Sequence, residues 1–165
     1  MSNRVERLRA SLEEPLLVSD ATNVRYLTSF ESSNAALLVE PDRVRLFADF
    51  RYAEGARRVA GVEFEETKRA LYADLATRLR GRIGFEPEAL SYAHWRALAD
   101  AGLELVPRSG LVERLRAVKD ESELEALRRA SEITSEAYAR LAEERFVGKG
   151  PDGYYEALAY LSRRG

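Results

Sequence analysis

The sequence contains no cysteine, and this absence excludes a disulfide framework and any thiolate metal site. A chain without cysteine fits a reducing compartment, so we expect a soluble, cytoplasmic protein. No apolar run approaches the ~20 residues that are needed to span a bilayer. The N-terminus, MSNRVERLRASLEE, is charged and amphipathic, unlike a secretory signal peptide. We therefore expect no membrane among the partners of this protein.

The chain also lacks an excess of positive charge. Its 26 basic and 28 acidic residues give a net charge of −2, so no global field attracts nucleic acid. Two pairs of adjacent basic residues, Arg57–Arg58 and Lys68–Arg69, are separated in the sequence by glutamates. We interpret both pairs as solvated surface and expect no nucleic acid partner.

The common catalytic motifs are missing as well. The sequence has no Gly-rich phosphate loop, no G-x-S-x-G and no H-E-x-x-H. His94 is the only histidine, and neighbouring Glu88 and Asp100 offer no recognisable metal-ligand spacing. We interpret His94 as a structural residue at or near the surface, and we place no catalytic residue and no metal ligand in this chain.

The stretch 23–52 is the segment around which the rest of the chain can be interpreted. Asp20 is placed to cap a short helix over 21–27, because an Asp side chain accepts from the unpaired amides of a first turn. A loop over 29–34 leads into two apolar runs, 35–40 and 44–48, which flank a Pro-Asp-Arg turn and so predict a β-hairpin. Asp49 is then placed to cap a helix over 50–58.

Short apolar runs alternate with helical patterns through the first 107 residues. The 165 residues are enough for one domain that buries roughly 70% of the surface of its unfolded chain. Beyond the stretch 23–52, the patterns predict a helix over 3–13, one helix capped by Thr67 and another capped by Ser91. They also predict strands over 16–19, 62–65, 83–86 and 103–106. This alternation predicts an α/β fold, a single domain whose sheet is covered by helices on both faces and is made mixed by the hairpin.

A long amphipathic helix is predicted from Asp120 to about Arg145. Asp120 and Glu123 have capping-box spacing. One face of this helix is apolar and carries Ala126, Leu127, Ala130, Ile133, Ala137, Tyr138 and Leu141. A glycine-rich link over 148–153 and a short helix over 154–163 follow.

Two patches of the sequence resemble a known family. The first is NVRYLTSF followed by Ser33, Asn34, the hairpin and a D-x-R-Y motif made by Asp49, Arg51 and Tyr52. The second is LVERLRAVKDESELEALRRASEI over 111–133. Together they resemble the N-terminal domain of the Xaa-Pro peptidases (aminopeptidase P and prolidase), which creatinase shares, and the segment that joins this domain to the pita-bread catalytic domain. The resemblance covers residues 15 to about 145.

The resemblance implies a roughly six-stranded mixed sheet over residues 1–118, with 119–165 forming a linker helix and the start of the catalytic domain. It implies that the full-length parent hydrolyses Xaa-Pro bonds in proline-containing peptides. The parent would use two divalent metal ions (manganese, cobalt or zinc) held by two Asp, one His and two Glu of the downstream domain. We therefore expect this chain to be inactive alone, and the choice among aminopeptidase, dipeptidase and creatinase-like activity stays open.

The resemblance also implies where a pocket lies, because in the family the loop that corresponds to Phe30, Ser33 and Asn34 approaches a catalytic pocket, often that of a neighbouring subunit. Arg51 and Tyr52 complete the set of pocket candidates. The alternative is purely structural: Phe30 lies in the core, Ser33 and Asn34 make turn bonds, and Tyr52 packs. In that alternative Asp49 caps, and Arg51 pairs with Glu54 or with Asp49.

Two further questions stay open at this level. The chain is either part of a peptidase or a stand-alone binding or scaffolding module with the same fold. The apolar face of the 120–145 helix predicts a homodimer, and the alternative is that the helix folds back on its own sheet.

Overall fold

The computed structural model describes residues 3–143 together with Tyr155, Ala159 and Arg163. The chain divides into two compact units, Met1–Ala117 and Val118–Gly165, and each is described here by itself. The elements of the first unit are α1 (Asn3–Arg9), β1 (Leu16–Val18), α2 (Ala21–Thr28), β2 (Ala35–Val39), β3 (Val44–Asp49), α3 (Ala53–Ala56), β4 (Glu63–Thr67), α4 (Leu71–Arg78), β5 (Arg82–Phe85), α5 (Tyr92–Asp100), β6 (Glu104–Pro107) and α6 (Leu111–Ala117).

The first unit is built on a six-stranded sheet in the order β4-β3-β2-β1-β5-β6. β2 pairs antiparallel with both β1 and β3, whereas the β3–β4, β1–β5 and β5–β6 pairs are parallel. The mixed, six-stranded α/β fold is therefore confirmed. The hairpin is confirmed too, with Val39 opposite Val44 and the Glu40 amide donating to the Arg43 carbonyl at 3.0 Å across the turn.

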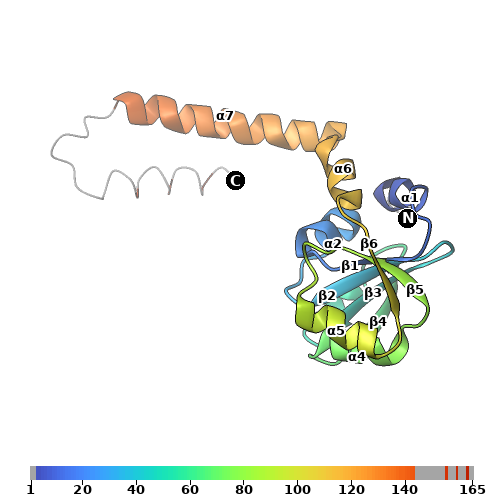
Figure 1. Ribbon diagram of the computed structural model, residues 1–165. Coiled ribbons are helices and arrows are strands. Elements are labelled where there is room, and N and C mark those ends of the chain that lie inside the picture. Colours follow the sequence, from blue (N-terminus) through green and yellow to red (C-terminus); the bar gives the residue numbers. More distant parts are fainter. Residues whose placement is uncertain (1–2, 144–154, 156–158, 160–162, 164–165) are drawn as a thin grey trace. The chain divides into compact units, whose positions relative to one another are not determined.

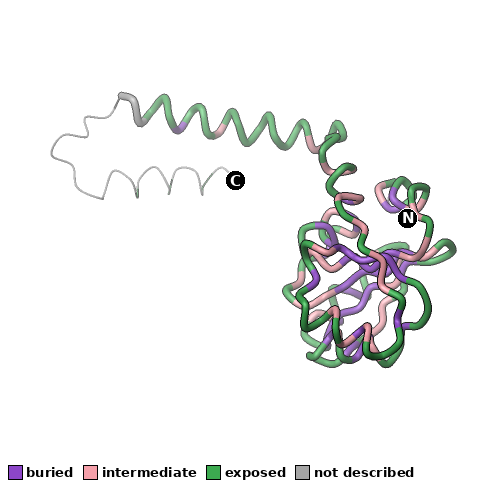
Figure 2. Tube along the Cα trace, in the orientation of Figure 1, coloured by how far each residue is buried: buried purple, intermediate pink, exposed green. Residues whose placement is uncertain are grey.

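Helices cover both faces of this sheet (Figure 1). One face carries side chains from α1, α2, α3 and α6, and the other carries side chains from α4 and α5. Successive residues of a strand point to opposite faces, so Leu38 and Phe47 bury on the α4/α5 face while Leu37 and Leu46 bury on the other. Buried residues accordingly concentrate in the sheet of this unit (Figure 2). Each such side chain contributes about 1.5–3 kcal/mol relative to remaining exposed.

Three of the predicted helix boundaries are wrong. The first helix ends at Arg9 instead of residue 13. Asp49 caps no helix, because it is the last residue of β3 and α3 begins only at Ala53 with Tyr52 as its N-cap. Thr67 belongs to β4, where it pairs with Asp49, and α4 begins four residues later. In both of the last two cases the strand continues through the polar residue that resembled a cap.

The other caps are as predicted. Asp20 accepts from the Asn23 amide at 2.9 Å, and Ser91 accepts from the His94 amide at 3.3 Å. α6 is an element that the sequence patterns did not single out.

The second unit contains α7 (Glu121–Glu143). Its capping box is confirmed, because the Asp120 amide donates to Glu123 and the Glu123 amide donates to Asp120, both at 2.9 Å. On its apolar face Leu127 is 52% exposed and Tyr138 is 69% exposed. The Leu141 side chain, the 148–153 link and the predicted 154–163 helix lie outside the described residues, apart from Tyr155, Ala159 and Arg163. Among the helices that the structure describes, none is both long and apolar enough to cross a membrane.

Candidate functional site

Two short segments come together at one end of the hairpin. The loop 29–34 leads into β2, and the turn 49–52 leaves β3. β2 and β3 are antiparallel neighbours with Ala35 opposite Ala48, so the start of one strand lies beside the end of the other. All five pocket candidates lie in these two segments, and the pairing of the strands brings them together.

Asp49 lies beneath this cluster with a side chain that is 0% exposed. Its Oδ1 accepts from the Arg51 amide at 3.0 Å and from Arg51 Nε at 2.9 Å. Its Oδ2 accepts from Arg51 Nη2 at 2.7 Å and from Asn34 Nδ2 at 2.6 Å. The carboxylate is therefore held by a two-pronged guanidinium contact, a geometry that is stronger than a single charged hydrogen bond. Of the two partners proposed for Arg51, the structure selects Asp49, and Glu54 pairs with Arg58.

These contacts set the charge of the pair. The hydrogen bonds from the Arg51 guanidinium hold the pKa of Asp49 well below its usual range, against the opposing effect of burial, and Asn34 adds to the lowering. The same contact raises the pKa of Arg51. Both groups are thus charged at neutral pH. Arg51 is nevertheless 40% exposed, so part of its guanidinium faces solvent.

Asn34 ties three segments together. Besides Asp49, its Nδ2 donates to the Arg69 carbonyl at 3.1 Å, in the connection between β4 and α4. Its own amide donates to Ser32 Oγ at 2.9 Å. The loop 29–34 is therefore anchored at its C-terminal end to two other parts of the unit.

Tyr52 organises the other half of the cluster. Its hydroxyl lies 2.7 Å from Ser33 Oγ and accepts weakly from the Ser33 amide at 3.4 Å. The Ser33 contacts lower the pKa of Tyr52. Phe30, which is buried, meets the Tyr52 ring edge-on with centroids 6.4 Å apart, and the Arg51 guanidinium lies 5.3 Å from the centre of the same ring. The packing and turn contacts that the purely structural alternative expects are therefore present. They involve Ser33 and Tyr52, which also reach the surface.

An open depression adjoins the cluster, lined by Ala21, Thr22, Arg25, Glu31, Ser32 and Ser33. Arg25 and Glu31 form an exposed ion pair across it at 2.6 Å. Phe50, between the buried Asp49 and the half-exposed Arg51, is also exposed. Hydroxyl, amide and guanidinium donors therefore stand beside aromatic rings on one surface, which is the composition of a pocket wall.

Metal-ligating groups do not gather in this way. Within residues 3–143 and the three further described positions, no three His, Cys, Asp or Glu side chains are grouped to hold a metal ion. His94 stacks on Tyr72 with ring centroids 4.1 Å apart. The described residues therefore do not fit a two-metal centre.

Comparisons with known proteins identify the family of this chain. Residues 4–118 match the Creatinase/Prolidase N-terminal domain. The chain belongs to this family. Its relatives include the "Uncharacterized peptidase YqhT" of Bacillus subtilis (strain 168), which is 32% identical over 135 residues, 76% of this chain and 38% of the relative.

Among solved structures, the Creatinase/Prolidase N-terminal domain described here resembles the Xaa-Pro dipeptidase from Bacillus anthracis, with a TM-score of 0.86 and 26% identity over 98% of this chain and 49% of that one. It also resembles the N-terminal domain of the cytoplasmic peptidase PepQ from Mycobacterium tuberculosis H37Rv, with a TM-score of 0.62 and 35% identity over 70% of this chain and 99% of that one. The chain thus contains the N-terminal domain of the Xaa-Pro peptidase family, and it spans less than half the length of YqhT and of the B. anthracis enzyme.

The sequence analysis missed one group of interacting polar residues in the family domain: Asn23, Glu86, Glu113 and Arg116. The only signal was Asn23, a polar side chain on the buried side of α2 beside Val24 and Leu27. Its partners are 63 to 93 residues away in sequence, and no local pattern connects them.

The Asp49–Arg51 pair predicts a specific response to acid. Because the folded-state pKa of Asp49 is lowered, its contribution to stability is present above the unfolded value of about 3.9 and is lost only as the pH falls through the folded value. Arg51→Met removes the main cause of the lowering, so the midpoint of acid unfolding, followed by circular dichroism, moves to higher pH.

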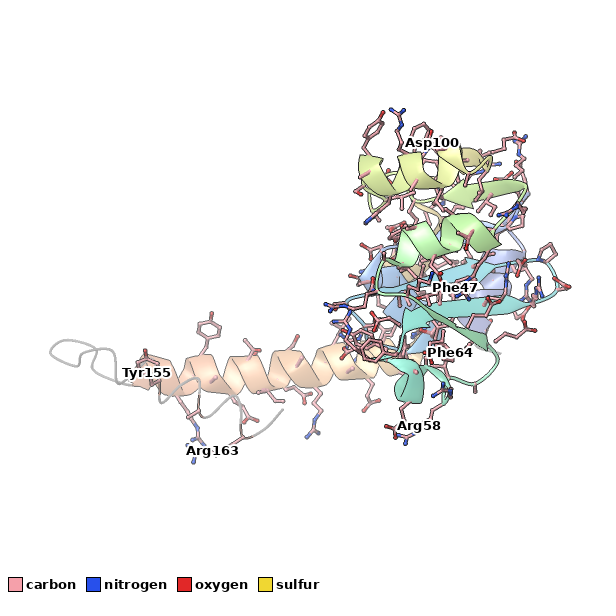
Figure 3. The ribbon with its side chains drawn as sticks, turned by 90° about the horizontal axis from the view of Figure 1, so that it is seen from below. Phe47, Arg58, Phe64, Asp100, Tyr155 and Arg163 are labelled. Carbon is pink, nitrogen blue, oxygen red and sulfur yellow. The ribbon has the colours of Figure 1, made fainter. Side chains whose placement is uncertain are left out.

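The matched control is Arg58→Met, which removes an arginine at the surface of the unit (Figure 3). Arg58 pairs with Glu54, and both of these side chains are exposed. This control leaves the midpoint in place, because such surface pairs contribute little. Equal shifts in the two variants would show that Asp49 does not depend on Arg51.

Proposed function

We propose that this chain is the non-catalytic N-terminal domain of an Xaa-Pro aminopeptidase or dipeptidase, and that Phe30, Ser33, Asn34, Arg51 and Tyr52 form a wall of its substrate pocket. The observation that carries this proposal is the convergence of the five residues at one end of the hairpin, on a fully buried Asp49. The wall contributes binding and orientation, and the bond-breaking chemistry belongs to another domain.

The cluster is suited to this role because it is preorganised. The Arg51 guanidinium is fixed by two bonds to Asp49, and the Tyr52 hydroxyl is fixed by Ser33. A wall whose side chains are already ordered loses little conformational freedom when a peptide binds. Aromatic rings with nearby donors complement a substrate that combines an apolar proline ring with polar peptide groups.

We infer the substrate class and the metals of the parent enzyme from the family to which the chain belongs. The B. anthracis neighbour is described as an Xaa-Pro dipeptidase, so we propose proline-containing peptides as the substrates of the parent enzyme. Two divalent ions (manganese, cobalt or zinc) would be held by the catalytic domain of that enzyme and would activate the attacking water there. The PepQ neighbour is described as cytoplasmic, and we propose the same location for this protein.

A stand-alone binding or scaffolding module is the second candidate. The PepQ structure is of the N-terminal domain of a peptidase, and 99% of it is matched here, so the fold can be obtained as a separate domain. The gene sequence after the codon for Gly165 distinguishes the two candidates. A continuation that encodes two Asp, one His and two Glu in a pita-bread domain supports the peptidase, and a stop codon supports the module.

The proposal predicts that the purified 165-residue chain hydrolyses no Xaa-Pro dipeptide or longer Xaa-Pro peptide, with or without added manganese, cobalt or zinc. The reason is that the family's metal ligands belong to the catalytic domain. Release of the N-terminal residue is followed by chromatography, with a mock purification from the same host as the control. Metal-dependent turnover above that control overturns the assignment of the chain as non-catalytic.

We also propose that the chain forms a homodimer through the apolar face of α7. Leu127 and Tyr138 on this face are exposed, and a twofold pairing of identical helices is the commonest way to cover such a surface. Sedimentation velocity at micromolar concentration is expected to show a dimer that Leu127→Glu with Tyr138→Glu converts to monomer. The control Arg129→Glu, about 200° around the helix from Leu127, keeps the dimer. A monomeric wild-type chain contradicts the proposal.

A further inference from the structure

A group of four polar residues joins α6 to the rest of the first unit. Asn23 of α2 is fully buried, and its Nδ2 donates to Glu86 Oε1 at 2.6 Å and to Glu113 Oε1 at 2.5 Å. Its Oδ1 accepts from Arg116 Nη1 at 2.9 Å. Glu113 and Arg116 belong to α6, whereas Glu86 directly follows β5. One buried amide therefore connects α2, the end of β5 and α6, and we name these four residues the α6 latch.

Glu86 is fixed at a distinctive place in the sheet. Its Oε2 accepts from the amides of Ser19 and Asp20, at 2.6 and 2.8 Å, which follow β1. β1 and β5 are parallel neighbours, and the helices that follow them, α2 and α5, lie on opposite faces of the sheet. In open α/β sheets, ligands bind beside the carboxyl ends of two such strands. Here the Glu86 carboxylate accepts hydrogen bonds at that position.

The hydrogen bonds of the latch have only one consistent direction. Both carboxylates accept only, and the guanidinium donates only. The Asn23 amide must therefore turn its nitrogen to Glu86 and Glu113 and its oxygen to Arg116. A rotation by 180° would place donors against donors and leave buried groups unpaired, which is costly. The hydrogen bonds of the latch thus hold α6 in one position.

Apolar packing on α6 is slight by comparison. Val112 is its one fully buried residue within the described part of the chain, and Leu111 and Leu115 are partly buried against the same core. The Leu115 carbonyl accepts from the Tyr26 hydroxyl at 3.3 Å. Elements with few buried apolar contacts open at lower free energy than the core of a domain. The polar latch therefore decides how firmly α6 is held.

The charges around Glu86 give the latch a pH dependence. Burial raises the pKa of Glu86, and the nearby Glu113 raises it further, while the amides of the β1–α2 turn and of Asn23 oppose the change. The Arg116 guanidinium donates to Asn23 Oδ1, on the side of the amide away from the two carboxylates. The Asp20 carboxylate is engaged in capping α2. On α4, Tyr72 is neutral, because burial raises its pKa to about 12.

The direction of the pH dependence follows from the raised pKa of Glu86. A carboxyl whose folded pKa is raised contributes stability that is fully present below its unfolded pKa, about 4.3 for Glu, and that is lost as the pH rises through the folded value. Glu86 and Glu113 share one donor group, so their repulsion is greatest when both are ionised.

We propose that Asn23, Glu86, Glu113 and Arg116 form a latch that releases α6 as a unit while the sheet stays folded, and that release becomes easier as the pH rises. α6 ends at Ala117, where the first unit ends, so the latch fixes the point at which the chain leaves that unit. This proposal is independent of the peptidase assignment.

Hydrogen exchange on the full 165-residue chain tests the latch. Protection factors, corrected for intrinsic exchange, are compared for 111–117 and for the hairpin 35–49 between pH 5 and pH 8. In the wild type, protection of α6 falls as the pH rises, and the hairpin does not change with it. Asn23→Leu removes the shared donor and lowers α6 protection about tenfold or more at pH 7, with recovery toward lower pH as Glu86 takes up a proton.

Two further variants keep the test decisive. Adding Glu86→Gln to Asn23→Leu removes one of the facing charges, so it restores α6 protection in part and flattens the pH dependence. Asp74→Asn is the matched control, because it alters a buried carboxylate on the opposite face of the sheet, where Asp74 pairs with Arg78 at 2.6 Å. In this control the protection of α6 does not fall relative to that of the hairpin. If Asn23→Leu does not fold, Arg116→Met takes its place. The proposal is overturned if α6 and the hairpin lose protection in parallel. It is also overturned if the protection of α6 does not change with pH.

Discussion

A carboxylate that is fully buried loses its hydration, and Asp49 recovers that loss only through four hydrogen bonds. The donors come from both sides of it in sequence, from the turn that follows β3 and from the loop that precedes β2. Each donor must therefore stay in place for the carboxylate to remain charged and buried. This requirement converts two surface segments, which would otherwise be adaptable, into one ordered surface with Tyr52, Ser33 and Phe30 arranged around it.

The rest of the first unit supplies the support for that surface. The sheet is buried on both faces, so the ends of β2 and β3 are fixed in register, and the loops inherit that precision. Binding groups on loops held by a rigid scaffold are the usual arrangement in functional domains. The family membership and the site geometry thus lead to the same proposal, a preformed wall that works together with chemistry located in another domain.

The sequence predicted those features that depend on local patterns. Alternation of apolar runs gave the hairpin and the mixed sheet, and capping chemistry located Asp20, Ser91 and the Asp120–Glu123 box. Asp49 was misassigned as a cap because a polar residue at the end of a strand has the same local signature as an N-cap. The sequence left Glu54 and Asp49 as alternative partners of Arg51, and only the structure shows that the Asp49 carboxylate binds both Arg51 and Asn34. The α6 latch could not be predicted from local patterns, because its only signal was Asn23 on the buried side of α2, and Glu113 is 90 residues away. The convergence of Phe30, Ser33, Asn34, Arg51 and Tyr52 was implied by resemblance, and its cause, the Ala35–Ala48 register, is a tertiary fact.

The central claim is that Asp49 organises both segments of the candidate site, and NMR of the Asp49→Asn variant tests it most directly. An Asn side chain has one acceptor oxygen with two lone pairs, so it cannot accept all four hydrogen bonds from Arg51 and Asn34. The account predicts that the amide resonances of 30–34 and 51–52 and the Asn34 side-chain NH₂ shift and lose exchange protection, while Leu38 and Phe47 stay protected. Asp42→Asn, in the exposed hairpin turn, is the control and leaves all of them unchanged. Unaltered resonances for the loop 29–34 in Asp49→Asn, in a variant whose hairpin is intact, would contradict the account.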